Sequence, residues 1–156
     1  MNMINRPAGR YLEEFTVGDV IETAGRTVTE ADIVLFAGLS GDYNPLHTNE
    51  EWAKNTPMGS RIAHGILVAA IASGLRMQSR MTEGTAIALL EIKETFLAPT
   101  KAGDTIYCRI TVEDVKPSKS KTDRGIVNYA CDVINQKGDT VIHQDIVVMV
   151  RRTPNQ

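Results

Sequence analysis

The 156-residue chain lacks most of the patterns that identify common enzymes and binding proteins. Its formal net charge is −2, so no basic excess points to nucleic acid. It contains no GxGxxG or Walker A string, so nucleotide binding through those loops is unsupported. Ser40 lies in the string GLSGD, which does not match the GxSxG pattern of a nucleophilic serine. His47, His64, Glu50 and Glu51 follow no HExxH-type spacing, so we expect no metal ion.

The sequence also has few cysteines and no long apolar run. Its two cysteines, Cys108 and Cys131, lie far apart in strand-like runs and form no CxxC motif. We therefore expect buried free thiols in a reducing compartment. The longest uncharged apolar run, Ile66–Leu75, is too short to span a bilayer, and no charged-then-apolar leader opens the chain. These absences predict a cytoplasmic protein that does not bind membranes.

The composition that remains is typical of one globular domain. Hydrophobic residues make up 42% of the chain and charged residues 23%. The length predicts a single domain. We expect this domain to span residues 11–151, between a flexible N-terminal tail, residues 1–10, and a C-terminal tail, residues 152–156.

The first third of the sequence predicts one strand and two short helices. Residues 20–28 have the alternating, β-branched character of a strand. Thr29 is placed to cap a short helix that follows it, with acidic residues in the first turn. Asn49 is placed to cap a second short helix over residues 50–54, and we expect Trp52 to pack inward from it.

The rest of the chain predicts an α+β fold. A helix from His64 to about Met81 contains the run Ile66–Leu75, which is apolar nearly all round. A helix that is hydrophobic on every side is expected to be buried on every side. Four strand-like runs separated by turn sequences follow it: residues 86–97, 104–115, 125–135 and 140–151. Together they predict an antiparallel β-sheet wrapped around a long central apolar α-helix.

The most informative segment is Phe36–His47, FAGLSGDYNPLH. Asp42 and His47 are five residues apart, with Pro45 between them. Pro45 disfavours helical geometry at Asn44, so we expect both side chains to project from a rigid, non-helical turn. A carboxylate and an imidazole fixed on a stiff loop are suited to proton transfer. The same residue types also occur in ordinary turns.

The whole string resembles the signature of the MaoC-like dehydratases, also called (R)-specific enoyl-CoA hydratases or hydratase 2. That signature has an aromatic residue, then small and apolar residues, then SGDxNPxH, with an alanine six residues after the histidine. The matching residues here are Phe36, Ser40, Gly41, Asp42, Asn44, Pro45, His47 and Ala53. The resemblance extends to the HG-led helix at His64 and to the strand-rich second half, and covers roughly residues 11–151.

This resemblance implies the hot-dog fold and the reversible syn hydration of a trans-2-enoyl-CoA to an (R)-3-hydroxyacyl-CoA. Asp42 and His47 match the residues with proton-transfer roles, and Asn44 would orient the water or the loop, unless it is only a turn residue. Gly65 matches the glycine whose backbone N–H stabilises the thioester oxygen. The start of a helix suits that part, because its first N–H groups are unpaired and its dipole favours negative charge. Coenzyme A would belong to the substrate, and no other cofactor is implied.

The sequence leaves the roles of several other residues open or assigns them a structural role. His64 is either a hydrogen-bonded structural residue or part of the cleft, whereas His143, in a strand, is expected to be structural. Lys119, Lys121 and Arg124 form a local basic cluster that is either a solvated loop or a clamp for coenzyme A phosphates. Members of the resembled family pair two such domains around the acyl thioester, which implies a homodimer or a higher homo-oligomer.

Two other functions remain open for a hot-dog protein. One is a thioesterase, which hydrolyses acyl thioesters, and the complete GDxNPxH string argues against it. The other is a non-catalytic subunit that binds acyl thioesters. The intact set of Asp42, Asn44 and His47 argues against that, since a degenerate relative would be expected to lose one of them.

Overall fold

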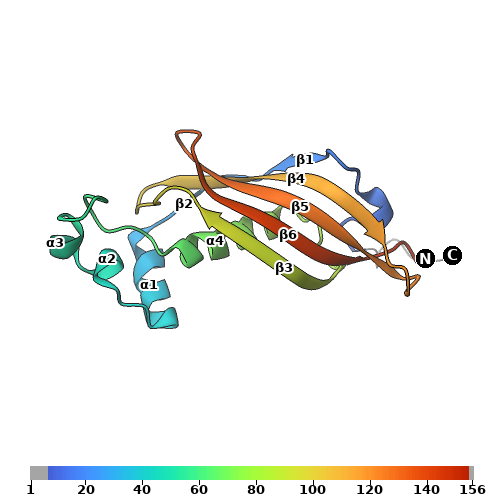
Figure 1. The fold of residues 1–156 in the computed structure, drawn as a ribbon, viewed down its shortest axis with the longest axis horizontal. Helices are drawn as coiled ribbons and strands as arrows, with labels where there is room; N and C mark the ends of the chain where they lie inside the picture. Colours follow the sequence, from blue (N-terminus) through green and yellow to red (C-terminus); the bar gives the residue numbers. More distant parts are fainter. Residues whose placement is uncertain (1–6, 155–156) are drawn as a thin grey trace.

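The computed structural model describes residues 7–154, and its strands form one antiparallel β-sheet. The strand order is β1-β4-β5-β6-β3, and β2 also pairs with β4 (Figure 1). The strands are β1 (Val20–Glu22), β2 (Arg26–Thr27), β3 (Ala86–Phe96), β4 (Thr105–Pro117), β5 (Arg124–Asn135) and β6 (Thr140–Arg151). The four long strands agree with the predicted runs to within two residues at every boundary.

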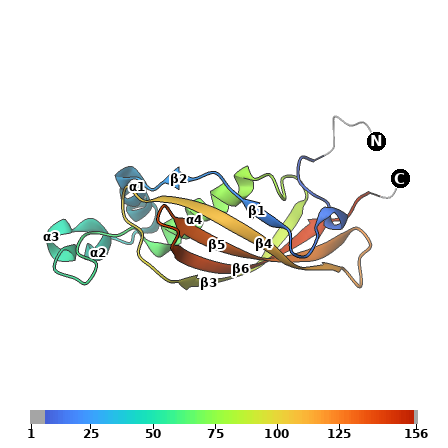
Figure 2. The ribbon, with the colours of Figure 1, turned by 90° about the horizontal axis from the view of Figure 1, so that it is seen from above.

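The core lies between this sheet and helix α4 (Gly65–Gln78), which runs along one face of it (Figure 2). Buried and partly exposed residues alternate along β5 and β6, as expected for strands with one face in the core. From the helix, Val68, Ala72 and Leu75 join the buried cluster. The predicted sheet around a central helix is therefore confirmed.

One side of α4 is not buried within a single chain. Ile66 is 58% exposed and Met77 is 51% exposed. Ala70 and Gly74 are exposed on the same helix, and their spacing places them on one face. The prediction that the helix is buried on every side is therefore wrong for the isolated chain.

Strand β3, at the edge of the sheet, has a similar unburied apolar surface. Its residues, and the residue that follows, include six exposed large hydrophobic side chains: Ile87, Leu89, Leu90, Ile92, Phe96 and Leu97. Natural proteins usually cover or charge an edge strand, because its unpaired backbone groups can pair with another chain. The exposed parts of β3 and α4 meet at Phe96 and Ile66, which line the same cavity.

Three helices gather at one end of the molecule: α1 (Glu30–Ser40), α2 (Pro45–Thr48) and α3 (Glu50–Ala53) (Figure 1). Thr29 caps α1 as predicted, since its Oγ1 accepts a hydrogen bond from Asp32 N at 3.2 Å. Asn49 caps α3, also as predicted, through a bond from Trp52 N to its Oδ1. Trp52 itself is 48% exposed, so the expected inward packing of its ring is wrong.

The predicted first strand is interrupted at Thr23. Thr23 N donates to Cys108 O at 3.0 Å, and Cys108 N donates to the side-chain Oγ1 of Thr23 at 2.9 Å. The side chain thus replaces a backbone acceptor of the ladder, and the segment divides into β1 and β2. Cys108 and Cys131 are buried free cysteines, as predicted.

The expected tails are only partly described, since residues 1–6 and 155–156 lie outside the described residues. Gly9 N donates to Glu83 O and Arg10 N to Met81 O, so these two residues pack against the domain rather than belonging to a flexible tail. At the other end, Arg152 and Thr153 bind Glu13, which lies within the short 3-10 helix η2 (Leu12–Glu14). Within residues 7–154, no helix is long and apolar enough to cross a membrane.

Candidate active site

The turn that carries Asp42 begins where α1 ends. Gly41 adopts the left-handed conformation, with φ of 75°, and its N–H bonds to Ala37 O. Glycine takes this conformation without a steric cost, which allows the chain to leave the helix sharply. Asp42 follows, and its Oδ1 accepts a hydrogen bond from Asn44 N at 3.1 Å. The backbone of the turn therefore holds the carboxylate.

His47 lies on a helix rather than on a non-helical turn, which corrects the prediction. Pro45 is the first residue of the single-turn helix α2. A proline is favoured there, since the first N–H of a helix has no partner within the helix. Asn44 Oδ1 caps the helix by accepting a bond from Leu46 N at 3.0 Å. Asn44 thus orients the loop between Asp42 and His47.

A backbone carbonyl fixes the tautomer of His47. Its Nδ1 lies 2.8 Å from Ile62 O. Because a carbonyl oxygen only accepts hydrogen bonds, Nδ1 must carry the proton. In the neutral ring Nε2 then carries the free lone pair, as a general base requires.

His64 lies buried beneath the pair, 3% exposed. Its Nε2 donates to the backbone oxygen of Asp42 at 2.9 Å. Its ring stacks on that of His47, with centroids 3.8 Å apart and planes 28° apart, and packs on Phe36 at 5.0 Å. His64 therefore positions both Asp42 and His47, which supports its structural interpretation.

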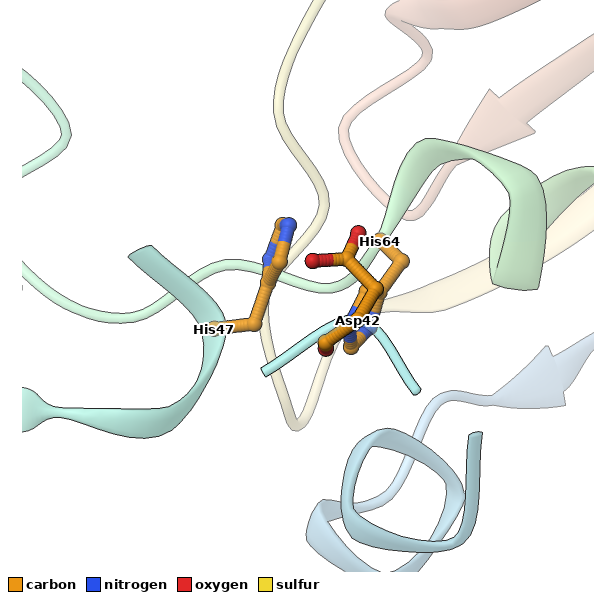
Figure 3. A group of neighbouring side chains, drawn as sticks. All are labelled: Asp42, His47 and His64. Carbon is orange, nitrogen blue, oxygen red and sulfur yellow. The ribbon is translucent and has the colours of Figure 1, made fainter. Parts of the chain in front are cut away.

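Asp42, His47 and His64 form a compact group (Figure 3), in which one ligand atom from each lies within 4.8 Å of the others. Such a set has the atom types of a metal site. However, the rings of His47 and His64 are stacked, with planes 28° apart, so their lone pairs point side by side rather than toward one common point. The geometry suits a water molecule or a proton between Asp42 and His47 better than a shared metal ion.

A cavity of about 470 Å³ opens beside His47. Its walls are mainly apolar and come from the loop before α4, the start of α4, the end of β3 with the loop after it, and β6: Met58, Ile62, Ala63, Gly65, Ile66, Val68, Phe96, Leu97, Ala98, Pro99, Thr100 and Ile142. The cavity thus joins an apolar lining, suited to a hydrocarbon chain, to a polar corner at His47.

Gly65 begins α4 at the wall of this cavity. Its N–H makes no hydrogen bond with any of the described residues, so it is free to donate to a ligand. A Cβ at this position would lie 2.6 Å from Cε1 of Phe96. The absence of a side chain at this position therefore makes room for the Phe96 ring.

The structure does not bring the predicted basic cluster to this site within one chain. Lys119 and Lys121 lie in the hairpin between β4 and β5, and Arg124 begins β5. Both views place this hairpin at the opposite end of the sheet from α2 (Figures 1 and 2). Arg124 also forms a two-bonded ion pair with Asp123.

His143 lies apart from the site, between two carboxylates. Its Nδ1 donates to Asp132 Oδ1 at 2.7 Å, and its Nε2 lies 3.3 Å from Asp145. The hydrogen bond with Asp132 raises the pKa of His143 against the opposing effect of burial, and the charge of Asp145 adds to the rise. These contacts support the structural interpretation.

Sequence reasoning missed two residues of the site. Ile62 acts through its carbonyl oxygen, which no pattern of side chains reveals. Phe96 ends a strand that appeared only as an apolar run, and nothing in the sequence showed that its ring covers Gly65.

The sheet, the helix along it and the polar turn beside the helix start define a hot-dog protein. Residues 14–134 match the family model described as "MaoC like domain". The chain therefore belongs to the MaoC-like dehydratase family, and the predicted family, fold and hydro-lyase class are confirmed.

Individual relatives agree with this assignment. The chain is 36% identical to the (R)-specific enoyl-CoA hydratase of Rhodospirillum rubrum over 90% of this chain and 91% of that protein. It is 32% identical to the 3-hydroxybutyryl-CoA dehydratase of Methylorubrum extorquens over 85% of this chain and 82% of that protein. A solved MaoC-like dehydratase from R. rubrum aligns with a TM-score of 0.83 at 34% identity, covering 94% of this chain and all of that one (100%).

Proposed function

We propose that the protein adds water reversibly to a trans-2-enoyl-CoA and forms an (R)-3-hydroxyacyl-CoA. One observation carries the proposal: the Asp42 and His47 side chains lie together where an apolar cavity meets the free N–H of Gly65. Acid–base groups, a place for an acyl chain and an oxyanion donor are the three parts that this reaction needs. The names of the relatives support the same substrate class.

Each group has a distinct role in the proposed hydration. A water molecule is held between the Asp42 carboxylate and Nε2 of His47. The pair removes a proton from this water as its oxygen bonds to the β-carbon. A proton then returns from the pair to the α-carbon on the same face, so that the addition is syn. Dehydration follows the same path in reverse.

The Gly65 N–H stabilises the charge that develops during this step. As the water attacks, electron density moves onto the thioester oxygen and gives an enolate. The N-terminus of α4 directs an unpaired N–H and the positive end of the helix dipole to that region. The helix is packed on the sheet through Val68 and Ala72, so the donor is in place before the reaction.

We also propose that the active form is a homodimer, joined along β3 and the exposed face of α4. A second copy would cover both apolar surfaces at once and extend the sheet across the β3 edge. Units of this fold do occur in pairs. A protein from Mycobacterium tuberculosis titled as having a double hot-dog fold aligns with a TM-score of 0.82, and this chain covers 46% of it.

The dimer can be tested at the edge strand. Ile92→Lys should put a charge into the shared surface, give monomers in sedimentation and abolish activity. Val34→Lys, at an exposed apolar residue of α1, is the matched control and should leave the dimer intact. A fully active wild-type monomer would contradict the proposal.

The catalytic proposal can be separated from its alternatives with a panel of trans-2-enoyl-CoAs of increasing chain length. Ultraviolet absorbance reports the conjugated double bond, and a thiol reagent reports free coenzyme A. Loss of the conjugated absorbance without thiol release supports the hydratase. Thiol release would identify a thioesterase, and binding without either signal would identify a non-catalytic subunit.

A further inference from the structure

A second cavity, of about 480 Å³, lies at the end of the sheet opposite His47. Three arginines line it, Arg124, Arg151 and Arg152, and we call it the arginine pocket. Lys119 and Lys121 lie on the adjoining hairpin between β4 and β5. Nothing in the proposed hydration within one chain uses these five cationic side chains.

The arginine pocket has more positive charge than its own carboxylates balance. Arg124 pairs with Asp123, and Arg152 pairs with Glu13. The Arg151 side chain forms no ion pair with any described residue and is exposed. A free guanidinium offers a planar fork of N–H groups that matches a phosphate. The pocket is therefore suited to a ligand with phosphate groups.

The two cavities lie at opposite ends of β3. Phe96 and Leu97, at its carboxyl end, line the cavity beside His47. Gly84 and Ile87, at its amino end, line the arginine pocket. Any partner whose β3 runs antiparallel to this strand would therefore bring its arginine pocket toward this chain's His47 cavity.

A symmetric dimer along β3 produces this arrangement. If both copies of α4 lie on the same face of a joined sheet, the two-fold axis is perpendicular to the sheet and the two β3 strands are antiparallel. The exposed apolar residues run from Ile87 to Leu97 and are centred on Ile92. An axis at Ile92 places Ile87 of one copy opposite Leu97 of the other.

We propose that the arginine pocket of one subunit binds the phosphates of the coenzyme A whose acyl thioester occupies the His47 cavity of the other subunit. This inference rests on the proposed function and on the proposed dimer. It explains why the basic cluster and the acid–base pair lie far apart in one chain: each site is completed by the partner. The bound chemistry is that of the nucleotide phosphates, and an acyl carrier protein, which presents a single phosphodiester, is the alternative source.

The phosphate contacts can be tested with two substrates that share one enoyl group. Trans-2-enoyl-CoA carries the nucleotide phosphates, and the corresponding enoyl-pantetheine lacks them. Arg151→Ala should lower kcat/KM for the CoA thioester about tenfold, the size expected for one lost charge-assisted hydrogen bond. It should leave kcat/KM for the pantetheine thioester within about twofold of wild type, because that substrate makes no phosphate contact.

Two comparisons make this test specific. Lys137→Ala removes a charge from the hairpin between β5 and β6 and should change neither substrate. Adding salt should lower wild-type kcat/KM for the CoA thioester more than that of Arg151→Ala. An equal loss on both substrates, or no loss on either, would overturn the inference. A wild-type preference for an enoyl-carrier protein, lost in Arg151→Ala, would overturn the assignment to coenzyme A.

Mixed dimers test whether the pocket acts on the partner's site. One chain carries Asp42→Asn with an intact arginine pocket, and the other carries Arg124→Ala and Arg151→Ala with an intact His47 cavity. If the pocket serves the partner, the purified mixed dimer has one complete site and regains wild-type kcat/KM per active site. If the pocket serves its own chain, the one chain with an intact Asp42 and His47 also carries the mutated arginine pocket. Its kcat/KM then stays low, and the inference fails.

Failure of this inference is distinguishable from failure of the proposed function. A wild-type protein that hydrates neither enoyl-CoA nor enoyl-pantetheine would overturn the function. A protein that hydrates both equally well, with no effect of Arg151→Ala, would keep the function and overturn only the phosphate subsite.

Discussion

The ring of His64 stacks on the ring of His47, with centroids 3.8 Å apart and planes 28° apart. The same His64 side chain donates its Nε2–H to the backbone oxygen of Asp42. One buried residue therefore holds the two members of the acid–base pair in a fixed relation. Since Asp42 and His47 belong to different local structures, a turn and the helix α2, this shared contact sets the distance between their side chains.

Replacing His64 by phenylalanine should separate its two contacts. His64→Phe keeps a ring against His47 but leaves the oxygen of Asp42 without its donor. We expect a loss of about 1–3 kcal/mol in unfolding free energy, measured by denaturant titration, and a lower kcat. His64→Gln is the complementary variant, because it keeps a donor and loses the ring. Wild-type stability and kcat in His64→Phe would show that Asp42 needs no such anchor.

Asp42→Asn and His47→Gln should each lower kcat by about 10²–10⁴-fold, because each removes one proton-transfer group. The double variant should be little worse than the worse single variant, since both groups act on one water molecule. Steady-state kinetics on the same enoyl-CoA measures these losses. Glu51→Gln, at an exposed carboxylate of α3, is the control. Additive losses would show that Asp42 and His47 do not act as a unit.

Gly65→Ala should disturb the site through Phe96. The new Cβ would lie 2.6 Å from Cε1 of that ring, so the ring must move into the cavity or away from the helix. A displacement of about 1 Å in a site of this kind can cost up to about 10²-fold in rate. Phe96→Leu in the same chain makes room for the methyl group and should restore part of kcat/KM. Full activity of Gly65→Ala alone would place the thioester oxygen elsewhere.

His143 should make stability depend on pH. Its pKa is raised above 6.5 by the hydrogen bond with Asp132, opposed by burial and helped by Asp145. The folded state thus favours the protonated ring, and its stabilisation is complete below the unfolded pKa and lost as pH rises through the folded pKa. His143→Gln should flatten the fall of the melting temperature above pH 6.5. An unchanged pH profile would assign the fall to other groups.

The strands and the helix caps were predictable because they depend on local patterns. Alternating burial along β5 and β6 follows directly from the alternation of apolar residues in the sequence. Thr29 and Asn49 cap the helices that they precede, as expected from their side chains. The Asp42–His47 turn was predicted as a site because its residue types match a proton-transfer pair, and the structure places both side chains in one compact group.

What the sequence did not reveal depends on contacts between distant segments or between chains. Pro45 was interpreted as a residue that prevents a helix, but at the first position of α2 it favours one. The apolar run of α4 predicted burial on every side, yet within one chain Ile66 and Met77 stay exposed. Within one chain, the structure gives no support to a clamp for coenzyme A phosphates made of Lys119, Lys121 and Arg124. Such a clamp becomes geometrically possible only in the proposed dimer.

The stereochemistry of the product tests the central claim most directly. Purified protein should be incubated with trans-2-butenoyl-CoA or a longer homologue, and the 3-hydroxyacyl product should be released and resolved on a chiral column. Addition from the single face set by Asp42, His47 and the Gly65 N–H predicts one enantiomer, and under the proposed function it is the (R) product. An (S) product, or a mixture of the two, would contradict the account even if the conjugated absorbance disappears.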